Sequence, residues 1–155
     1  MSGVVDPHAK VWIDGELVAA RHAAVSATDH GLIVGDGAFE TLQVLDRGAF
    51  AVRRHLRRLR TTLAALAISA PGDDILAEAL AQVVAANERT AGRVRPTVTA
   101  GAGPLGSGEP TGPARVVVAG QPPGAGPLPV AVTVPWTRNE MGALAGLKTT
   151  SYAEN

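Results

Sequence analysis

Hydrophobic positions at helical spacing predict two helices in the middle of the chain. Residues 53–68 carry leucines every three or four positions, which indicates a helix with a single apolar stripe. Pro71 and Gly72 interrupt this pattern, and Asp73 stands where it would cap a second helix. The apolar stripe of the second helix comprises Ile75, Leu76, Ala79, Leu80, Val83 and Val84.

Shorter apolar runs predict strands on both sides of these helices. Residues 11–18 are expected to form a hairpin turned by Asp14 and Gly15, because glycine accepts a positive φ at little cost. Residues 22–37 are expected to form a loop. Residues 38–45 and 49–52 are expected to form two paired strands joined by a turn at 46–48.

Residues 93–99 alternate as a strand does, with Arg93 and Arg95 on the polar face. Pro96 lies on the apolar face and favours an edge position, because proline has no N–H to give to a neighbouring strand. Residues 101–113 form a predicted glycine-rich loop. Residues 115–119 form a predicted buried strand. Together with the helices, these strands predict a mixed α/β (α+β) fold.

A proline- and glycine-rich stretch at residues 121–127 indicates a linker between domains. We therefore expect a domain at 1–120, an interdomain loop at 121–128 and the start of a second domain at 129–155, with a strand at 129–134. The segment after the linker is too short to bury a core by itself. The sequence is thus expected to be interrupted within its second domain.

Composition and charge exclude several classes of function. The 14 basic and 14 acidic residues balance, which argues against nucleic acid or an acidic membrane surface as a partner. Cysteine is absent, so disulfides and zinc–thiolate sites are excluded. No apolar run reaches the roughly 20 residues of a membrane span, and the first ten residues show no secretory signal. A cytoplasmic location is the default expectation.

Candidate chemistry rests on a few cations. Lys10 and Lys148 are the two lysines, and Lys148 follows an apolar run of small residues. Burial favours the neutral amine of a lysine, so Lys148 could act as a nucleophile, although a surface lysine is the simpler interpretation. The arginines of residues 53–60 could bind an anion or simply form a solvated helix face. The motif at residues 35–40 fails the dinucleotide fingerprint, since Glu40 replaces the third glycine.

Several short motifs follow one another along the sequence, at residues 29–32, 35–42, 55–59, 93–96, 99–101, 136–140 and 145–152. Each motif alone is weak, but their order and spacing cover nearly the whole chain. Taken in this order, they resemble the fold-type IV pyridoxal-phosphate enzymes, also called class IV aminotransferases. The family includes branched-chain aminotransferases, D-amino-acid aminotransferases and aminodeoxychorismate lyase.

The resemblance implies roles for particular residues. Lys148 matches the catalytic lysine that forms a Schiff base with pyridoxal 5'-phosphate, and Arg58 matches the ligand of the cofactor's phosphate. Glu40 and Arg95 match positions on the substrate side of the cofactor. Further substrate-binding candidates are Arg93, Arg138 and Tyr152.

The resemblance also implies a small N-terminal domain, a closing interdomain loop and the beginning of a larger barrel-like domain. It covers about the first half of such an enzyme. The acidic partner of the pyridine nitrogen would lie beyond Asn155, so a second polypeptide or a missing segment is expected to complete the C-terminal domain. A homodimer is implied as well.

Two reactions are compatible with the same lysine. Reprotonation on the cofactor carbon gives transamination of an amino acid to a keto acid, whereas elimination from aminodeoxychorismate gives pyruvate and 4-aminobenzoate. Residues 35–41 and 99–106 look more like the lyase and D-amino-acid branches, which favours the lyase slightly. A D-amino-acid or branched-chain aminotransferase is the alternative. A non-catalytic fragment or dimerisation module is a further one.

Overall fold

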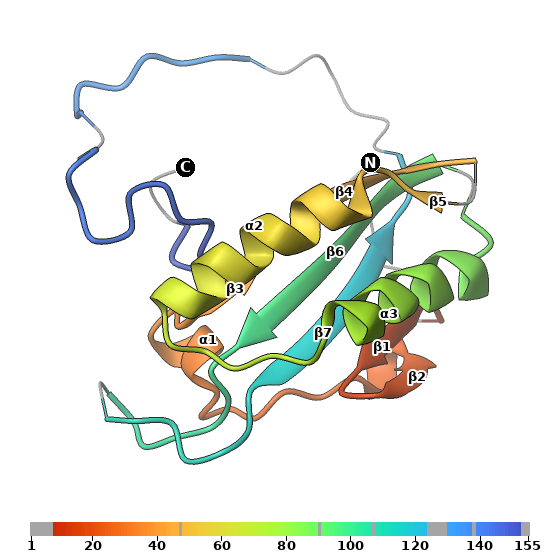
Figure 1. Cartoon of the computed structure of the whole chain (residues 1–155), viewed down its shortest axis with the longest axis horizontal. Helices are drawn as coiled ribbons and strands as arrows, with labels where there is room; N and C mark the ends of the chain where they lie inside the picture. The colour runs from red at the N-terminus through yellow and green to blue at the C-terminus, as the bar shows by residue number, and fades with distance from the viewer. Residues whose placement is uncertain are drawn as a thin grey trace.

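The computed structural model describes residues 8–46, 48–89, 91–106, 108–123, 130–137 and 139–152. These residues form an antiparallel sheet with two long helices, α2 and α3, packed on one of its faces (Figure 1). The α+β class predicted from the sequence is therefore confirmed.

Seven strands make up the sheet in the described part of the chain. They are β1 (Lys10–Ile13), β2 (Glu16–Ala19), β3 (Gly37–Phe39), β4 (Leu42–Leu45), β5 (Gly48–Ala49), β6 (Ala91–Thr99) and β7 (Arg115–Gln121). Their spatial order is β2-β1-β7-β6-β4-β5, and β3 also pairs with β6. The helices are the 3₁₀ turn η1 (Ala20–His22), α1 (His30–Ile33), α2 (Val52–Ala65) and α3 (Asp73–Ala86).

The helical stripes form most of the core predicted for them. Leu56, Leu59 and Leu63 of α2 are buried. The buried positions of α3 are Leu76, Ala79, Leu80, Val83 and Val84. Ile75, predicted for the same stripe, is 47% exposed, so its place in the core was predicted wrongly. They pack against strand residues such as Val94 and Val98. Each such side chain contributes about 1.5–3 kcal/mol on burial, which makes this layer the main source of stability.

The starts of the two helices differ from the prediction. The first helix, α2, begins at Val52. The strand predicted at 49–52 therefore stops early, and β5 ends at Ala49. The second takes Gly72 as its N-cap, and Asp73 is its first helical residue. The Asp73 carboxylate accepts a 2.7 Å hydrogen bond from Arg60 Nε, so it joins the two helices and caps neither.

Strand β6 is central, which corrects the edge position predicted from Pro96. It pairs with β7 on one side and with β3 and β4 on the other. The register is continuous, with Phe39 opposite Thr97 and Leu42 opposite Val94. The missing N–H of Pro96 falls at the break between β3 and β4, where the Pro96 carbonyl still accepts from the Glu40 amide at 3.0 Å. The single strand predicted at 38–45 is split for this reason.

Two other expectations need correction. The predicted loop at residues 22–37 contains the helical turn α1, which is capped by the Asp29 carboxylate through one bond, from the Gly31 amide to Oδ1 at 2.8 Å. Residues 130–134 form no strand and are exposed. The predicted linker overlaps residues 124–129, which lie outside the described residues, so the domain division stays a prediction.

The last described segment returns to the sheet beside β3 (Figure 1). Thr149 forms an isolated bridge with Ala38, and the Thr150 amide donates to the Gly37 carbonyl at 2.8 Å. The Thr150 hydroxyl also donates to the Gly35 carbonyl at 2.7 Å. This pairing fixes Lys148 at the junction of β3 and α2. Among the described residues, no helix is long and apolar enough to cross a membrane.

Candidate active site

The backbone of Lys148 is held at both of its polar groups. Its carbonyl accepts a hydrogen bond from the Phe39 amide at 3.3 Å, and its amide donates to the Thr62 hydroxyl at 3.2 Å. Phe39 belongs to β3 and Thr62 to α2, so the sheet and the helix together place this residue.

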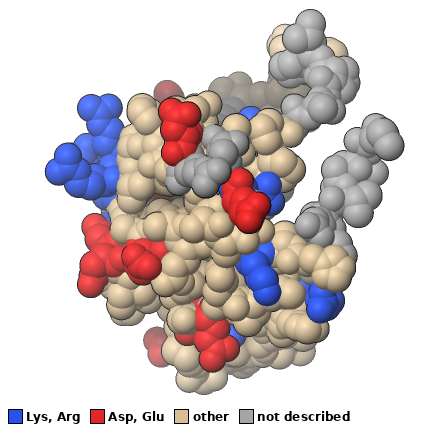
Figure 2. Space-filling model, turned by 90° about the vertical axis from the view of Figure 1, so that its right-hand side faces the viewer, with Lys and Arg blue, Asp and Glu red and all other residues tan. Residues whose placement is uncertain are grey.

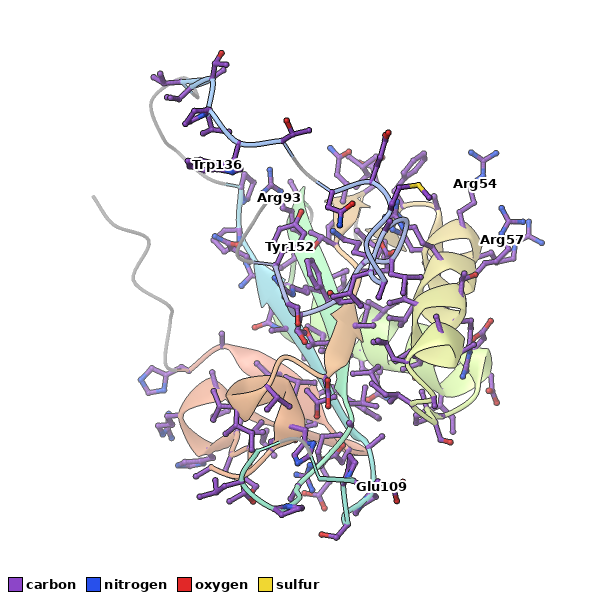
Figure 3. The ribbon with its side chains drawn as sticks, turned by 90° about the vertical axis from the view of Figure 1, so that its left-hand side faces the viewer. Arg54, Arg57, Arg93, Glu109, Trp136 and Tyr152 are labelled. Carbon is purple, nitrogen blue, oxygen red and sulfur yellow. The ribbon has the colours of Figure 1, made fainter. Side chains whose placement is uncertain are left out.

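The Lys148 amine lies against two aromatic rings. Its Nζ is 4.1 Å from the centroid of Phe39 and 4.9 Å from that of Tyr152. The two rings meet edge to face with centroids 5.2 Å apart. Phe39 is buried, whereas Tyr152 is partly exposed, so the amine contacts a buried ring on the protein side and a partly exposed ring on the solvent side. Figure 3 shows Tyr152, the last described residue of the returning segment, beside the sheet.

The Arg95 guanidinium also contacts the Phe39 ring. Its guanidinium carbon lies 3.6 Å from the Phe39 centroid, so the ring that contacts the lysine amine also contacts a second cation. Partial desolvation lowers the pKa of Arg95 below its ordinary value, and the Tyr152 phenol opposes that shift. The guanidinium remains charged at neutral pH. The two cations in contact with Phe39 give this part of the molecule positive charge, which favours an anion.

Arg58 is held by Glu40, the residue that follows β3. Its Nε and Nη2 atoms donate to the two carboxylate oxygens of Glu40 at 2.5 and 2.6 Å. The His55 ring nitrogen Nδ1 lies 2.8 Å from Glu40 Oε2. Glu40 is fully buried, while the Arg58 side chain is 56% exposed. Glu40 therefore uses one edge of the guanidinium, and three of its five N–H groups remain for a ligand.

The charge state of Glu40 follows from these partners. Burial raises the pKa of the carboxyl, but the hydrogen bonds from Arg58 and His55 and the charge of Arg58 outweigh burial. The pKa of Glu40 is therefore lowered from its ordinary value, and the group is ionised at neutral pH. A buried carboxylate of this kind fixes the direction of Arg58.

The exposed side of Arg58 opens into a shallow pocket of about 540 Å³. Arg54, Arg57, Thr61 and Phe50 share its lining. Figure 3 shows Arg54 and Arg57 projecting outward from α2. Basic side chains here gather around Arg58, whereas the face in Figure 2 carries interspersed acidic and basic groups. This part of the surface is suited to an anion.

The remaining predicted residues lie elsewhere. Arg93 is two residues from Arg95 on the same strand face, but it lines a different pocket of about 570 Å³ with Gln43 and Pro123. Arg138 lies outside the described residues. Sequence reasoning gave no role to Phe39, Thr62 or His55. Phe39 and His55 stand inside the motifs that carry the family resemblance, so their positions offered a signal, whereas nothing singled out Thr62.

Comparisons with known proteins identify relatives of this chain. A family model described as amino-transferase class IV matches residues 37–155. The D-alanine aminotransferase of Staphylococcus epidermidis is 29% identical over 110 residues, which cover 70% of this chain and 39% of that protein.

Solved structures agree in fold. The branched-chain amino acid aminotransferase of T.th., solved with pyridoxamine 5'-phosphate, aligns with a TM-score of 0.69 and 29% identity, over 76% of this chain and 41% of that chain. The 4-amino-4-deoxychorismate lyase of Pseudomonas aeruginosa aligns with a TM-score of 0.63 and 34% identity, also over 76% and 41%. The chain thus spans about two fifths of the length of the relatives it matches.

Proposed function

Because this chain belongs to the class IV aminotransferase family, we propose that it forms the lysine-bearing part of a pyridoxal-phosphate enzyme acting on a small amino-bearing substrate. The observation that carries the proposal is the junction of β3 and α2. There the Lys148 amine lies on the Phe39 ring, and the backbone of Lys148 is tied to the helix that carries Arg58.

The described residues fit an anionic aldehyde cofactor. Arg58 keeps free N–H donors for a phosphate group and is held in place by a buried carboxylate. Lys148 supplies a primary amine, the group that can attach to an aldehyde. We propose that these two residues hold pyridoxal 5'-phosphate. The related branched-chain enzyme of T.th. contains pyridoxamine 5'-phosphate, which supports this choice.

When bound, the cofactor supplies an electron sink for negative charge at the substrate's α-carbon. The chain's own contribution is to bind, orient and move a proton. Lys148 Nζ would take the proton from the α-carbon as a general base. As a general acid it would then deliver a proton to the departing enolpyruvyl group in the lyase reaction, or to the cofactor carbon in transamination. The Phe39 and Tyr152 rings limit access of water to the amine.

Arg95 is proposed to bind a substrate carboxylate. Its guanidinium shares the Phe39 ring with the lysine amine, so a carboxylate there would lie close to the reacting amino group. Tyr152 lies at the edge of the same ring and would complete the wall. Arg93 lies further along the strand and is a weaker candidate for the same anion, and Arg138 is carried by the resemblance alone.

For the reaction itself, we propose 4-amino-4-deoxychorismate lyase activity, giving 4-aminobenzoate and pyruvate. The support is the 34% identity to the Pseudomonas aeruginosa lyase and the motif at residues 35–41. A transaminase is the alternative, supported by the higher TM-score of the branched-chain enzyme and by the D-alanine aminotransferase relative.

Product analysis distinguishes the two reactions. The protein, supplied with pyridoxal 5'-phosphate, is incubated with aminodeoxychorismate and, separately, with amino acid and keto acid pairs. Release of 4-aminobenzoate with an equal amount of pyruvate supports the lyase. Amino-group exchange without elimination would refute it in favour of a transaminase. Lys148→Ala should abolish either reaction, and Lys10→Ala should leave it unchanged.

The family resemblance also predicts a homodimer, and a cytoplasmic location is the default expectation from the sequence; we keep both as part of the proposal. Light scattering on the purified protein tests the dimer: twice the polypeptide mass is expected, and a monomeric mass at micromolar concentration would contradict it. Cell fractionation tests the location.

A further inference from the structure

Thr62 differs from an ordinary helical threonine. It is 1% exposed, and its hydroxyl donates to the Arg58 carbonyl one turn earlier at 3.2 Å. The same oxygen accepts the amide N–H of Lys148, a residue 86 positions away in the sequence. One hydroxyl thus joins the helix of the proposed phosphate ligand to the residue that carries the amine.

The neighbouring Thr61 provides an internal comparison. Its hydroxyl makes the equivalent bond to the Arg57 carbonyl, also at 3.2 Å, but it is exposed on the outer side of α2. A threonine in a helix commonly bonds to the carbonyl four residues earlier. The bond to Lys148 is therefore the feature that sets Thr62 apart.

The contact belongs to a closed circuit. Lys148 bonds to Phe39 through its carbonyl and to Thr62 through its amide. Thr62 bonds to the Arg58 backbone, and the Arg58 guanidinium bonds to Glu40, the residue after Phe39. This circuit holds the Lys148 backbone and the Arg58 guanidinium relative to each other. Among the described hydrogen bonds, the one at Thr62 is the only link between α2 and Lys148.

We propose that Thr62 is a positioning residue that sets the placement of Lys148 relative to Arg58, and through it the fit of the cofactor. The inference rests on the proposed function. Without the hydroxyl, the partly buried Lys148 amide loses its acceptor. Leaving such a donor unpaired is unfavourable, so the segment would move toward water and away from α2.

The test compares Thr62→Val with Thr61→Val in the full protein. Valine keeps the branched shape and removes the hydroxyl. Thr62→Ser keeps the hydroxyl. Thr62→Ser and Thr62→Ala form a second comparison, since serine and alanine differ only in the hydroxyl oxygen. Two quantities are measured: hydrogen exchange of the Lys148 amide without cofactor, and the dissociation constant of pyridoxal 5'-phosphate from absorbance titration.

Thr62→Val should speed exchange at Lys148 about five- to tenfold, the worth of one hydrogen bond, and raise the dissociation constant by a similar factor. Exchange at core amides such as Leu63 and Val98 should stay within about twofold, which a general loss of stability would not produce. Thr61→Val should leave exchange at the Lys148 amide unchanged, because its hydroxyl bonds only within α2 in the described hydrogen-bond pattern. Thr62→Ser should resemble the wild type in both quantities. If Thr62→Val fails to fold, the same difference is expected between Thr62→Ala and Thr62→Ser.

Unchanged exchange at the Lys148 amide in Thr62→Val, or equally fast exchange at that amide in Thr61→Val, would overturn the inference. Exchange that rises at all core amides alike would also overturn it, because Thr62 would then be a structural residue. Failure of the proposed function looks different: the wild type itself would bind no cofactor at Lys148, and the positioning role would fall with it.

Discussion

Replacing the buried carboxylate by its neutral isostere, Glu40→Gln, tests how Arg58 is held. Glu40 accepts two hydrogen bonds from Arg58 and faces His55 across 2.8 Å. Glutamine offers one acceptor oxygen, and its amide nitrogen would face donors of the same kind. At least one charge-assisted bond is therefore lost, and the others become weaker.

The expected loss of stability follows from the geometry. Removing one partner of a buried ion pair costs about 3–5 kcal/mol when the other charge is stranded. Arg58 is 56% exposed and can be solvated after the change, so the cost falls below that of a fully buried pair. We expect the free energy of unfolding to fall by about 1–3 kcal/mol at pH 7.

The pH dependence provides the sharper signature. The pKa of Glu40 is lowered in the folded state from its ordinary value of 4.5. Its contribution is therefore fully present above about pH 4.5 and is lost as pH falls through the folded-state pKa. The stability difference between wild type and Glu40→Gln should be largest near neutral pH and should shrink in acid.

Urea unfolding at pH 7, 5 and 3, followed by tryptophan fluorescence, measures this difference. Trp12 is 5% exposed in the core, so its emission reports unfolding. Glu78→Gln is the matched control, since Glu78 is exposed on α3 and bonds only to Gln82 in the described hydrogen-bond pattern. The control should change stability by less than about 0.5 kcal/mol. A Glu40→Gln loss that stays constant with pH would refute the reasoning.

Two further changes probe the core and the substrate side. Leu59→Ala removes a side chain that is 1% exposed between α2 and the sheet. The free energy of unfolding, measured by the same urea titration, should fall by about 2–5 kcal/mol. A loss below about 1 kcal/mol would contradict the assigned packing. Arg95→Ala should raise KM for a carboxylate substrate about tenfold or more in steady-state kinetics, because a charged hydrogen bond is removed. Arg93→Ala, on the same strand face, should change KM less than threefold, and equal effects of the two would argue against Arg95 as the carboxylate ligand.

Local patterns were sufficient to predict the main elements. The leucine stripe at 56, 59 and 63 and the Asp14-Gly15 turn depend on neighbouring residues, and both are found as predicted. The position of a strand within the sheet could not be predicted from local patterns. Pro96 is central because the chain across from it breaks at the point where its N–H is missing, and no local signal shows that accommodation.

The site could be predicted only in part. Lys148 and Arg58 were named through the family motifs, since each motif keeps a chemical group at a fixed place in the chain. Their partners come from contacts between distant segments. The bond from Lys148 to Thr62 spans 86 residues, and the ion pair of Glu40 with Arg58 spans 18. Periodicity reports which face a residue occupies, but it does not report which residue on another element lies opposite.

The central claim is that the Lys148 amine holds the cofactor. The most direct measurement is borohydride reduction of the purified protein after incubation with pyridoxal 5'-phosphate, followed by peptide mapping by mass spectrometry. Reduction makes the attachment permanent, and Lys10, exposed in β1, serves as the internal control. The account predicts a pyridoxyl-phosphate mass on the Lys148 peptide and none on the Lys10 peptide. An unmodified Lys148, or equal labelling of both lysines, would contradict it.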